Sequence, residues 1–302
     1  MHVNGPGALM IPKILLYTPS LQRFHLCDCP AGVDVLASLV QLFGAQLLHL
    51  DITLSEEDVP LSLALIGKFV ALQRLQLNLH ELEDTLTISD GPTTAFHMPK
   101  LRSLELNPCN HEEFARFIAR GYFPALIELT FKFVHRPVGH QPTTCEAVRL
   151  LFEKFGSGLK RISVSAPELE DIAEILFPFM TNVEEITMRL ELFPTLLDIA
   201  RFIPKSVVRL CLETYWNMTA YDHALVSCLD DLHYNAKQLP LSLVVRMLSS
   251  GTHPFLWRTV TGTNPSLAGK LLRYSLWLQE EGIQLQDESG MWVGITMGLT
   301  GS

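Results

Sequence analysis

The sequence has little charge. Asp, Glu, Lys and Arg make up only 18% of its 302 residues, whereas an ordinary soluble domain carries about 25%. No run of Lys or Arg occurs, and 32 acidic against 23 basic residues give a net charge of −9. Nucleic-acid-binding proteins usually carry a basic patch or stripe, so we expect no nucleic-acid partner. With 48% hydrophobic residues, the chain is also too apolar to be mainly disordered.

The familiar motifs of metal binding, catalysis and export are also lacking. None of the six cysteines falls in a CxxC pair, and GxGxxG, Walker A and HExxH motifs do not occur. We therefore expect no metal site, no cofactor and no enzymatic activity. No basic segment followed by an apolar core marks a signal peptide. The most apolar stretch, residues 30–50, is interrupted by polar residues and by Gly44, so we expect no membrane span. Free thiols and the missing export signal predict a cytoplasmic or nuclear protein.

Leucine, in contrast, is abundant, and its spacing repeats. The chain has 52 leucines, and the pattern Leu-x-x-Leu-x-Leu, with aliphatic or Phe substitutes, recurs eight times. The first positions of these triplets are Leu21, Leu47, Leu72, Leu101, Leu126, Leu159, Val183 and Val207. Most steps between them fall in the 20–29-residue range of leucine-rich repeats. The last two apolar positions of each triplet are two apart, which is the period of a strand. A ninth, weaker copy is expected at Leu229.

Helix-like runs separate the triplets. They cover residues 33–43, 56–70, 111–119, 145–155, 168–177 and 193–202. Patterns that resemble capping boxes begin at Ser55, Asn110, Thr143 and Ser165, soon after a predicted strand. The alternation predicts an α/β fold, a leucine-rich-repeat solenoid shaped as a horseshoe with a parallel concave sheet and helices on the convex side. Residues 81–99 and 134–142 are expected to be irregular insertions at its surface.

The two ends of the chain are expected to differ from the repeats. Residues 1–20 are predicted to form a partial N-terminal repeat, in which residues 11–16 are the closing helix of a repeat whose strand is absent. Repeats occupy residues 21–234, a C-terminal capping section 235–288 and a flexible tail 289–302. In the capping section, a helix from Asn264-Pro265 to about Glu281 precedes an edge strand at 283–287. Because solenoid ends need polar caps, the apolar start favours an N-terminally incomplete chain over one that another subunit covers.

Three stretches resemble the irregular leucine-rich-repeat regions of fungal F-box-type proteins. They are Pro-Lys-Leu101-Arg-Ser-Leu-Glu-Leu, Phe123-Pro-Ala-Leu-Ile-Glu-Leu-Thr-Phe, and Leu271–Leu278 leading into Glu280-Glu281-Gly282-Ile283. The resemblance covers about residues 11–287 and implies that the repeats bind substrate proteins. Members of that family carry an N-terminal F-box that docks on a Skp-type adaptor of a ubiquitin ligase. Residues 1–9 are too short for an F-box, so a Skp-type adaptor is expected as a partner only if an F-box lies upstream.

Strand alternation predicts which side chains face the concave side. These are the second, fourth and sixth residues after each triplet start. Apart from Cys27 and Cys211, all of them are polar, and we take most of the polar ones as candidates for protein contacts. The candidates are Arg23, His49, Asp51, Arg74, Gln76, Asn78, Glu105, Asn107, Glu128, Lys132, Arg161, Glu185, Arg189, Arg209 and Glu213. With six basic and five acidic residues, this face is expected to be nearly neutral. It includes no aromatic residue, which lowers the expectation of a strong hot spot.

The sequence therefore predicts a non-catalytic protein–protein interaction module. Through the resemblance, it is expected to be the substrate-recognition part of an F-box-type ubiquitin ligase subunit. Three alternatives stay open. One is a leucine-rich-repeat regulator or sensor unrelated to ubiquitin ligases, another is an N-terminally incomplete fragment without independent function, and the last is a merely solvated sheet face.

Overall fold

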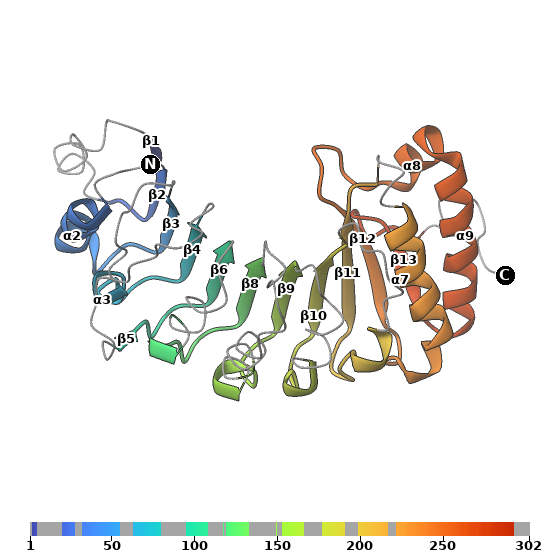
Figure 1. The fold of residues 1–302 in the computed structure, drawn as a ribbon, viewed down its shortest axis with the longest axis horizontal. Helices are drawn as coiled ribbons and strands as arrows, with labels where there is room; N and C mark the ends of the chain where they lie inside the picture. The colour runs from blue at the N-terminus through green and yellow to red at the C-terminus, as the bar shows by residue number, and fades with distance from the viewer. Residues whose placement is uncertain are drawn as a thin grey trace, which may run out of the picture. The chain divides into compact units, whose positions relative to one another are not determined.

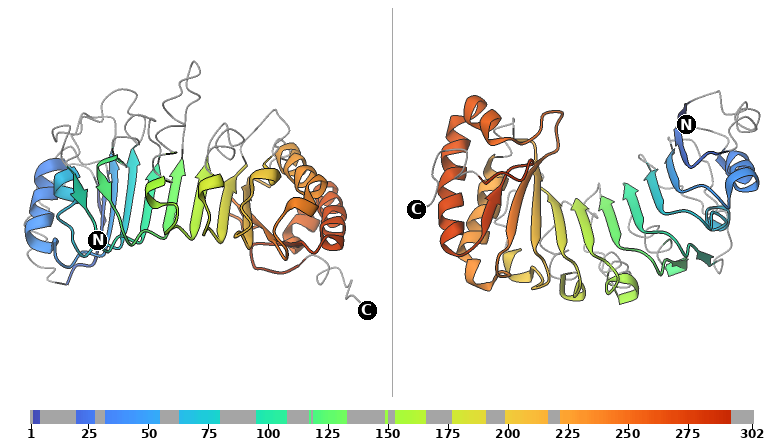
Figure 2. Two further views of the ribbon diagram at one scale, coloured as in Figure 1. Left: turned by 90° about the horizontal axis from the view of Figure 1, so that it is seen from below. Right: turned by 180° about the vertical axis from the view of Figure 1, so that it is seen from behind.

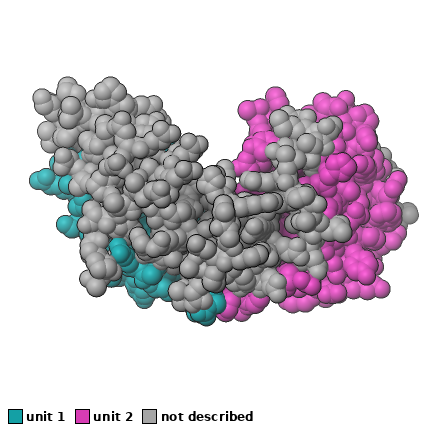
Figure 3. Space-filling view, in the orientation of Figure 1, with its two compact units in different colours: residues 1–159 teal, residues 160–302 magenta. Residues whose placement is uncertain are grey.

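The chain divides into two compact units, Met1–Leu159 (unit 1) and Lys160–Ser302 (unit 2) (Figure 3). The structure is a computed structural model. It describes residues 2–4, 20–27, 32–54, 63–79, 95–107, 117, 119–132, 149, 153–165, 177–190, 199–216 and 222–292.

Unit 1 is built on a parallel sheet whose strands follow one another in chain order (Figure 1). Its strands are β1 (His2–Asn4), β2 (Arg23–Cys27), β3 (His49–Leu54), β4 (Arg74–Leu79), β6 (Ser103–Asn107) and β8 (Glu128–Lys132). A small second sheet pairs β5 (Phe96–His97) with β7 (Gly121–Tyr122). The described helices are α2 (Gly32–Phe43), which the sequence predicted at 33–43, and α3 (Leu63–Ile66).

The strand register of unit 1 aligns the apolar triplets. Phe24, Leu50, Leu75, Leu104 and Leu129 lie side by side on successive strands, and each is at most 2% exposed. Burying one such side chain is worth about 1.5–3 kcal/mol. Since a slip of one residue would turn the whole row toward solvent, burial fixes the register.

Unit 2 repeats this arrangement. Its parallel sheet has the order β9-β10-β11-β12-β13, formed by β9 (Arg161–Ser165), β10 (Glu185–Arg189), β11 (Arg209–Thr214), β12 (Val244–Ser249) and β13 (Gln284–Gln286). Short 3-10 helices occupy Phe177–Phe179, Ala200–Phe202 and Ala236–Gln238. Three α-helices, seen in Figure 2, are α7 (Asp222–Tyr234), α8 (Trp257–Thr263) and α9 (Pro265–Glu280). Ordered parallel strands that bury the leucine triplets confirm the α/β leucine-rich-repeat fold.

The last two strands depart from the leucine triplet. Ser242 and Gly282 stand where earlier repeats have the first leucine, and both have a positive φ, 61° and 81°. The following residues, Leu243 and Ile283, take over the core position and are 0% and 1% exposed. Apolar residues in these strands therefore recur at every second position from the start. The Leu-x-x-Leu-x-Leu pattern begins with a spacing of three, so a search for it misses these strands.

The predicted ninth triplet at Leu229 is wrong. Leu229 and Leu232 are buried residues of helix α7, and the ninth repeat's strand is β12 instead. A Leu-x-x-Leu spacing also places two side chains on one helix face, so the pattern alone is ambiguous. The parallel ladder consequently continues past residue 234, into the segment predicted as a cap.

The expectation that the first repeat lacks a strand is also wrong. Strand β1 pairs in parallel with β2, and Val3 lies opposite Leu26. Its sequence, His-Val-Asn, carries a single apolar residue, and three residues are too few to hold the six-residue triplet. A search for triplets could not find it.

Several predicted elements lie outside the described residues. They include the helix at 11–16, most of the inter-strand helices after α3, the capping boxes at Ser55, Asn110 and Thr143, the loop at 134–142 and most of the tail. Between 81 and 99, the described residues form β5, so this insertion contains a short strand. No helix in the described part of the chain is both long and apolar enough to cross a membrane.

Hydrogen bonds close the C-terminal end of unit 2. Asn264 caps α9 as predicted, since its side chain accepts from the Leu267 N–H at 3.0 Å. The buried Asp287 carboxylate accepts from the N–H groups of Trp257 and Met291, at 3.2 and 2.9 Å. The chain then turns back, and Trp292 forms an antiparallel bridge with Gln286 of the edge strand.

Two glycines of unit 2 should respond oppositely to alanine. A Cβ at Gly282 or Gly269 would meet open space, so only the backbone matters. Gly282→Ala should cost about 1–2 kcal/mol because φ is left-handed, whereas Gly269→Ala, inside helix α9, should gain about 0.5–1 kcal/mol. Urea unfolding of the two variants and the parent measures both changes. A stabilised Gly282→Ala variant would contradict the left-handed turn.

Candidate functional site

The polar side chains of the unit 1 sheet form three rows across its strands, which we call the unit 1 face. The first row is Arg23, His49, Arg74, Ser103 and Glu128, the second His25, Asp51, Gln76, Glu105 and Thr130, and the third Thr53, Asn78 and Asn107. The sequence predicted these rows in this register. Lys132 ends β8, but its side chain lies outside the described part of the chain, as does that of Cys27.

Cross-strand hydrogen bonds tie the second and third rows together. Asn78 donates to Asp51 Oδ1 at 3.2 Å and to Thr53 Oγ1 at 3.1 Å. Its own Oδ1 accepts from Asn107 at 3.3 Å, and Asn107 also donates to Glu105 at 2.7 Å. Such a network holds each side chain in one orientation before any ligand arrives, which lowers the entropy cost of binding.

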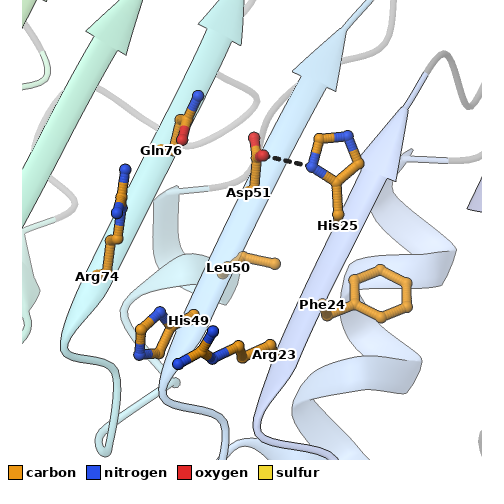
Figure 4. A pocket seen from close by; sticks show the side chains of 8 residues that line it. All are labelled: Arg23, Phe24, His25, His49, Leu50, Asp51, Arg74 and Gln76. Atoms are coloured by element: carbon orange, nitrogen blue, oxygen red, sulfur yellow. Dashed lines mark hydrogen bonds and ion pairs between the residues drawn. The ribbon is translucent and has the colours of Figure 1, made fainter. Parts of the chain in front are cut away.

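A pocket of about 220 Å³ opens on the unit 1 face, at the first residues of strands β2, β3 and β4 (Figure 4). Arg23 and His49 lie next to each other on adjacent strands, with Arg74 on the third. Across the pocket, the His25 ring nitrogen Nδ1 contacts the Asp51 carboxylate. Arg74 also donates to Glu105 at 3.2 Å. The cations Arg23 and Arg74 therefore line one side of the pocket, and the Asp51 carboxylate lines the other.

His49 sits between the two arginines. Partial burial, followed by the positive charges of Arg23 and then Arg74, lowers its pKa from the ordinary value of 6.5. A histidine whose pKa is depressed by folding is neutral in the native state while the unfolded chain already binds a proton. Its contribution to stability is therefore present above pH 6.5 and is lost as the pH falls through the folded-state pKa.

The unit 2 face is the corresponding polar side of the second sheet. Its rows are Arg161, Glu185, Arg209, Val244 and Gln284; then Ser163, Thr187, Cys211, Arg246 and Gln286; and then Arg189 and Glu213. Four arginines face two glutamates here. This balance differs from that of the unit 1 face, where two arginines face three carboxylates.

Three arginines of the unit 2 face are anchored by neighbours. Arg209 donates to Glu185 Oε2 at 2.6 Å. Arg246 donates to Gln286 Oε1 at 3.2 Å. Arg189 bonds the Tyr215 hydroxyl, and its guanidinium lies 5.2 Å from the centre of the Tyr215 ring. The side chains of this face thus have defined positions too.

Two small residues expected on the exposed side are buried. Cys211 is 3% and Ser165 7% exposed, although alternation places both on the polar side of the sheet. Burial, and next the charge of Glu185, raises the pKa of the Cys211 thiol to about 11, so the thiol is neutral and carries no nucleophilic character at physiological pH.

Sequence reasoning missed Arg246, Gln286 and Tyr215. The first two lie on β12 and β13, which the triplet search did not detect, although period-two alternation through Val245 and Met247 could have placed Arg246 outward. Tyr215 follows the end of β11 and contacts the Arg189 guanidinium. Among the described residues, no group of three or more His, Cys, Asp or Glu is placed to hold a metal ion.

Comparisons with known proteins add a structural likeness. No protein family matches the sequence, and no curated protein matches it. Among solved structures, the leucine-rich-repeat-containing protein LegL7 from Legionella pneumophila is similar, with 12% identity and a TM-score of 0.48, over 90% of this chain and 92% of that one. The fold assignment rests on the register and burial of this chain's own strands.

Removal of one flanking arginine should change the titration of His49. Arg74→Gln takes away one of the charges that lower the pKa of His49, so the pKa should move up toward 6.5. An NMR titration of the His49 ring measures it. Lys68→Gln, an exposed charge beyond α3, is the matched control and should leave the titration midpoint in place. An unmoved midpoint in Arg74→Gln would refute the electrostatic assignment.

Proposed function

We propose that this chain is a non-catalytic protein-binding module that uses the unit 1 face and the unit 2 face. The observation that carries the proposal is the cross-strand network around Asn78, which holds polar side chains of several strands in fixed positions on a solvent-facing sheet. Solvation alone does not require such order, because water satisfies polar side chains in any orientation. A partner protein, in contrast, gains affinity from a surface that is already ordered.

The dimensions of the faces favour a macromolecule over a small ligand. Neighbouring strands lie about 4.8 Å apart, so five strands give a row roughly 19 Å long. The pocket at Arg23 holds about 220 Å³ and opens onto the face, whereas ligand pockets are usually about 300–1,000 Å³. A single side chain of a partner fits such a pocket, and the neighbouring side chains of that partner can contact the rest of the row.

The resemblance to fungal F-box-type proteins supports a narrower form of this proposal. In that form, the faces bind the substrate of a ubiquitin ligase, in the cytoplasm or nucleus, and an F-box elsewhere in the full-length protein docks on a Skp-type adaptor. Buried free thiols at Cys211 and Cys228 suit a reducing compartment. Co-purification of a Skp-type adaptor and a cullin with the full-length protein would support this form. Their absence would leave the general proposal in place and remove the ligase role.

Substitutions on the faces should weaken partner binding, whereas matched substitutions elsewhere should not. A partner recovered from the native cell would be purified, and its dissociation constant measured by calorimetry. Arg23→Ala and Arg74→Ala should each raise the dissociation constant about tenfold or more, as expected for arginine hot spots. The control Lys68→Ala removes an exposed cation away from the face and should change it less than twofold.

The opposite pattern would overturn the proposal. If the face variants bind the partner as the parent does, while Lys68→Ala or Arg258→Ala on helix α8 abolishes binding, then the partner docks on the helical side. Urea unfolding of each variant should accompany the binding data, so that lost binding is not confused with lost folding.

A further inference from the structure

The unit 2 face carries an excess of positive charge that the rest of the chain does not share. The whole sequence has a net charge of −9, yet four arginines meet only two glutamates on this face. Strand β13, at its edge, contributes the uncharged Gln284 and Gln286. A cationic surface on an acidic protein selects its ligands by charge. The negatively charged remainder of the molecule repels anions, whereas this face attracts them.

Three of the arginines surround one position of the sheet. Arg246 lies directly opposite Cys211 on the next strand, and Arg209 lies two residues before Cys211 on the same strand. Arg189 lies on the other neighbouring strand, opposite Glu213. Strand spacing and residue rise place Arg209 roughly 8 Å from Arg246, and Arg189 roughly 12 Å from Arg246. We call Arg189, Arg209 and Arg246 the arginine cluster.

Each member of the arginine cluster keeps hydrogen-bonding capacity in reserve. A guanidinium has five N–H donors, and one from each is used by Glu185, Gln286 or Tyr215. The Nε atoms of all three are buried and have no hydrogen-bond partner among the described residues. Each guanidinium also has Nη–H donors beyond the one in use, and a carboxylate or phosphate can engage two nitrogens of one guanidinium.

We propose that the arginine cluster binds an extended acidic segment of a partner protein through two or more carboxylate or phosphate groups. The proposal rests on the proposed function of the faces and names the chemistry of the partner. Alternate residues of an extended peptide lie about 6.6–6.8 Å apart on one side, close to the spacing of Arg209 and Arg246. The favoured segment therefore has acidic residues at every second position.

The buried base of the cluster suits this ligand. The thiol of Cys211 is uncharged and adds no repulsion between the ligand and the cluster. Tyr215 holds the Arg189 guanidinium by its hydroxyl and its ring, which fixes the planar fork needed for a bidentate contact. Glu185 neutralises part of the charge of Arg209, so Arg246 is expected to contribute more than Arg209.

The test uses the full chain and fluorescein-labelled peptides in which glycine alternates with aspartate, phosphoserine, asparagine or lysine. Anisotropy titrations should show binding of the aspartate and phosphoserine peptides. The affinity for the asparagine peptide should be lower by about tenfold or more, and the lysine peptide should not bind. Higher affinity for phosphoserine than for aspartate would identify phosphate as the preferred group, and the reverse order would identify carboxylate. Equal binding of the aspartate and asparagine peptides would overturn the proposal.

Variants locate the binding to the cluster. Arg246→Gln and Arg189→Gln should each weaken the acidic peptides about tenfold, whereas Arg258→Gln and Lys270→Gln, exposed cations on α8 and α9, should change binding less than twofold. Arg246→Lys keeps the charge and loses the planar guanidinium, so an intermediate loss of affinity is expected. This variant also tests the site if Arg246→Gln fails to fold. Retained binding in all cluster variants would place the peptide elsewhere and refute the proposal, as would tighter binding of a single-stranded RNA of equal charge.

The same variants separate this proposal from the proposed function. If a native partner binds the unit 1 face and is insensitive to Arg246→Gln, the acidic-segment proposal fails while the protein-binding role stands. If acidic peptides bind the cluster but no cellular protein binding depends on either face, the proposed function fails instead.

Discussion

The structure depends on the parallel register of its strands. Within each unit, the strands of the main sheet pair without a slip, so the apolar side chains of one repeat lie against those of its neighbours and the polar side chains form rows. The packed apolar side chains form the core, and the rows of polar side chains form the two faces. Because burial of the leucines fixes the register, the arrangement of charges on the faces is a by-product of hydrophobic packing.

The sequence predicted this register from Leu21 to Leu212 because period and repeat length agree there. It failed where those signals change. β1 is too short to carry a triplet, Leu229 and Leu232 satisfy helix and strand spacing alike, and Ser242 replaces the leucine that would have marked β12. Only the last failure comes from a backbone feature, the left-handed Ser242, that compensates for a missing leucine.

The same gap affected the faces. Counted over eight strands, their charges nearly balance, and the sequence therefore predicted a neutral surface. Arg246 lies on the strand that the triplet search missed, and division of the chain into two units separates a nearly balanced face in unit 1 from a cationic one in unit 2. The burial of Cys211 could not be predicted either, because strand alternation alone places its side chain on the polar side of the sheet. Electrostatic character here belongs to each unit and not to the chain average.

The bridge between Gln286 and Trp292 concerns the edge of the unit 2 sheet. An edge strand offers unpaired backbone groups to any other strand, which is a common route to aggregation. β13 has only three residues, and the returning chain occupies part of its free side. Another molecule that approached this edge would meet a backbone already paired and a tryptophan ring bonded to Ser275. The closure of unit 2 thus also protects the protein from edge-to-edge polymerisation.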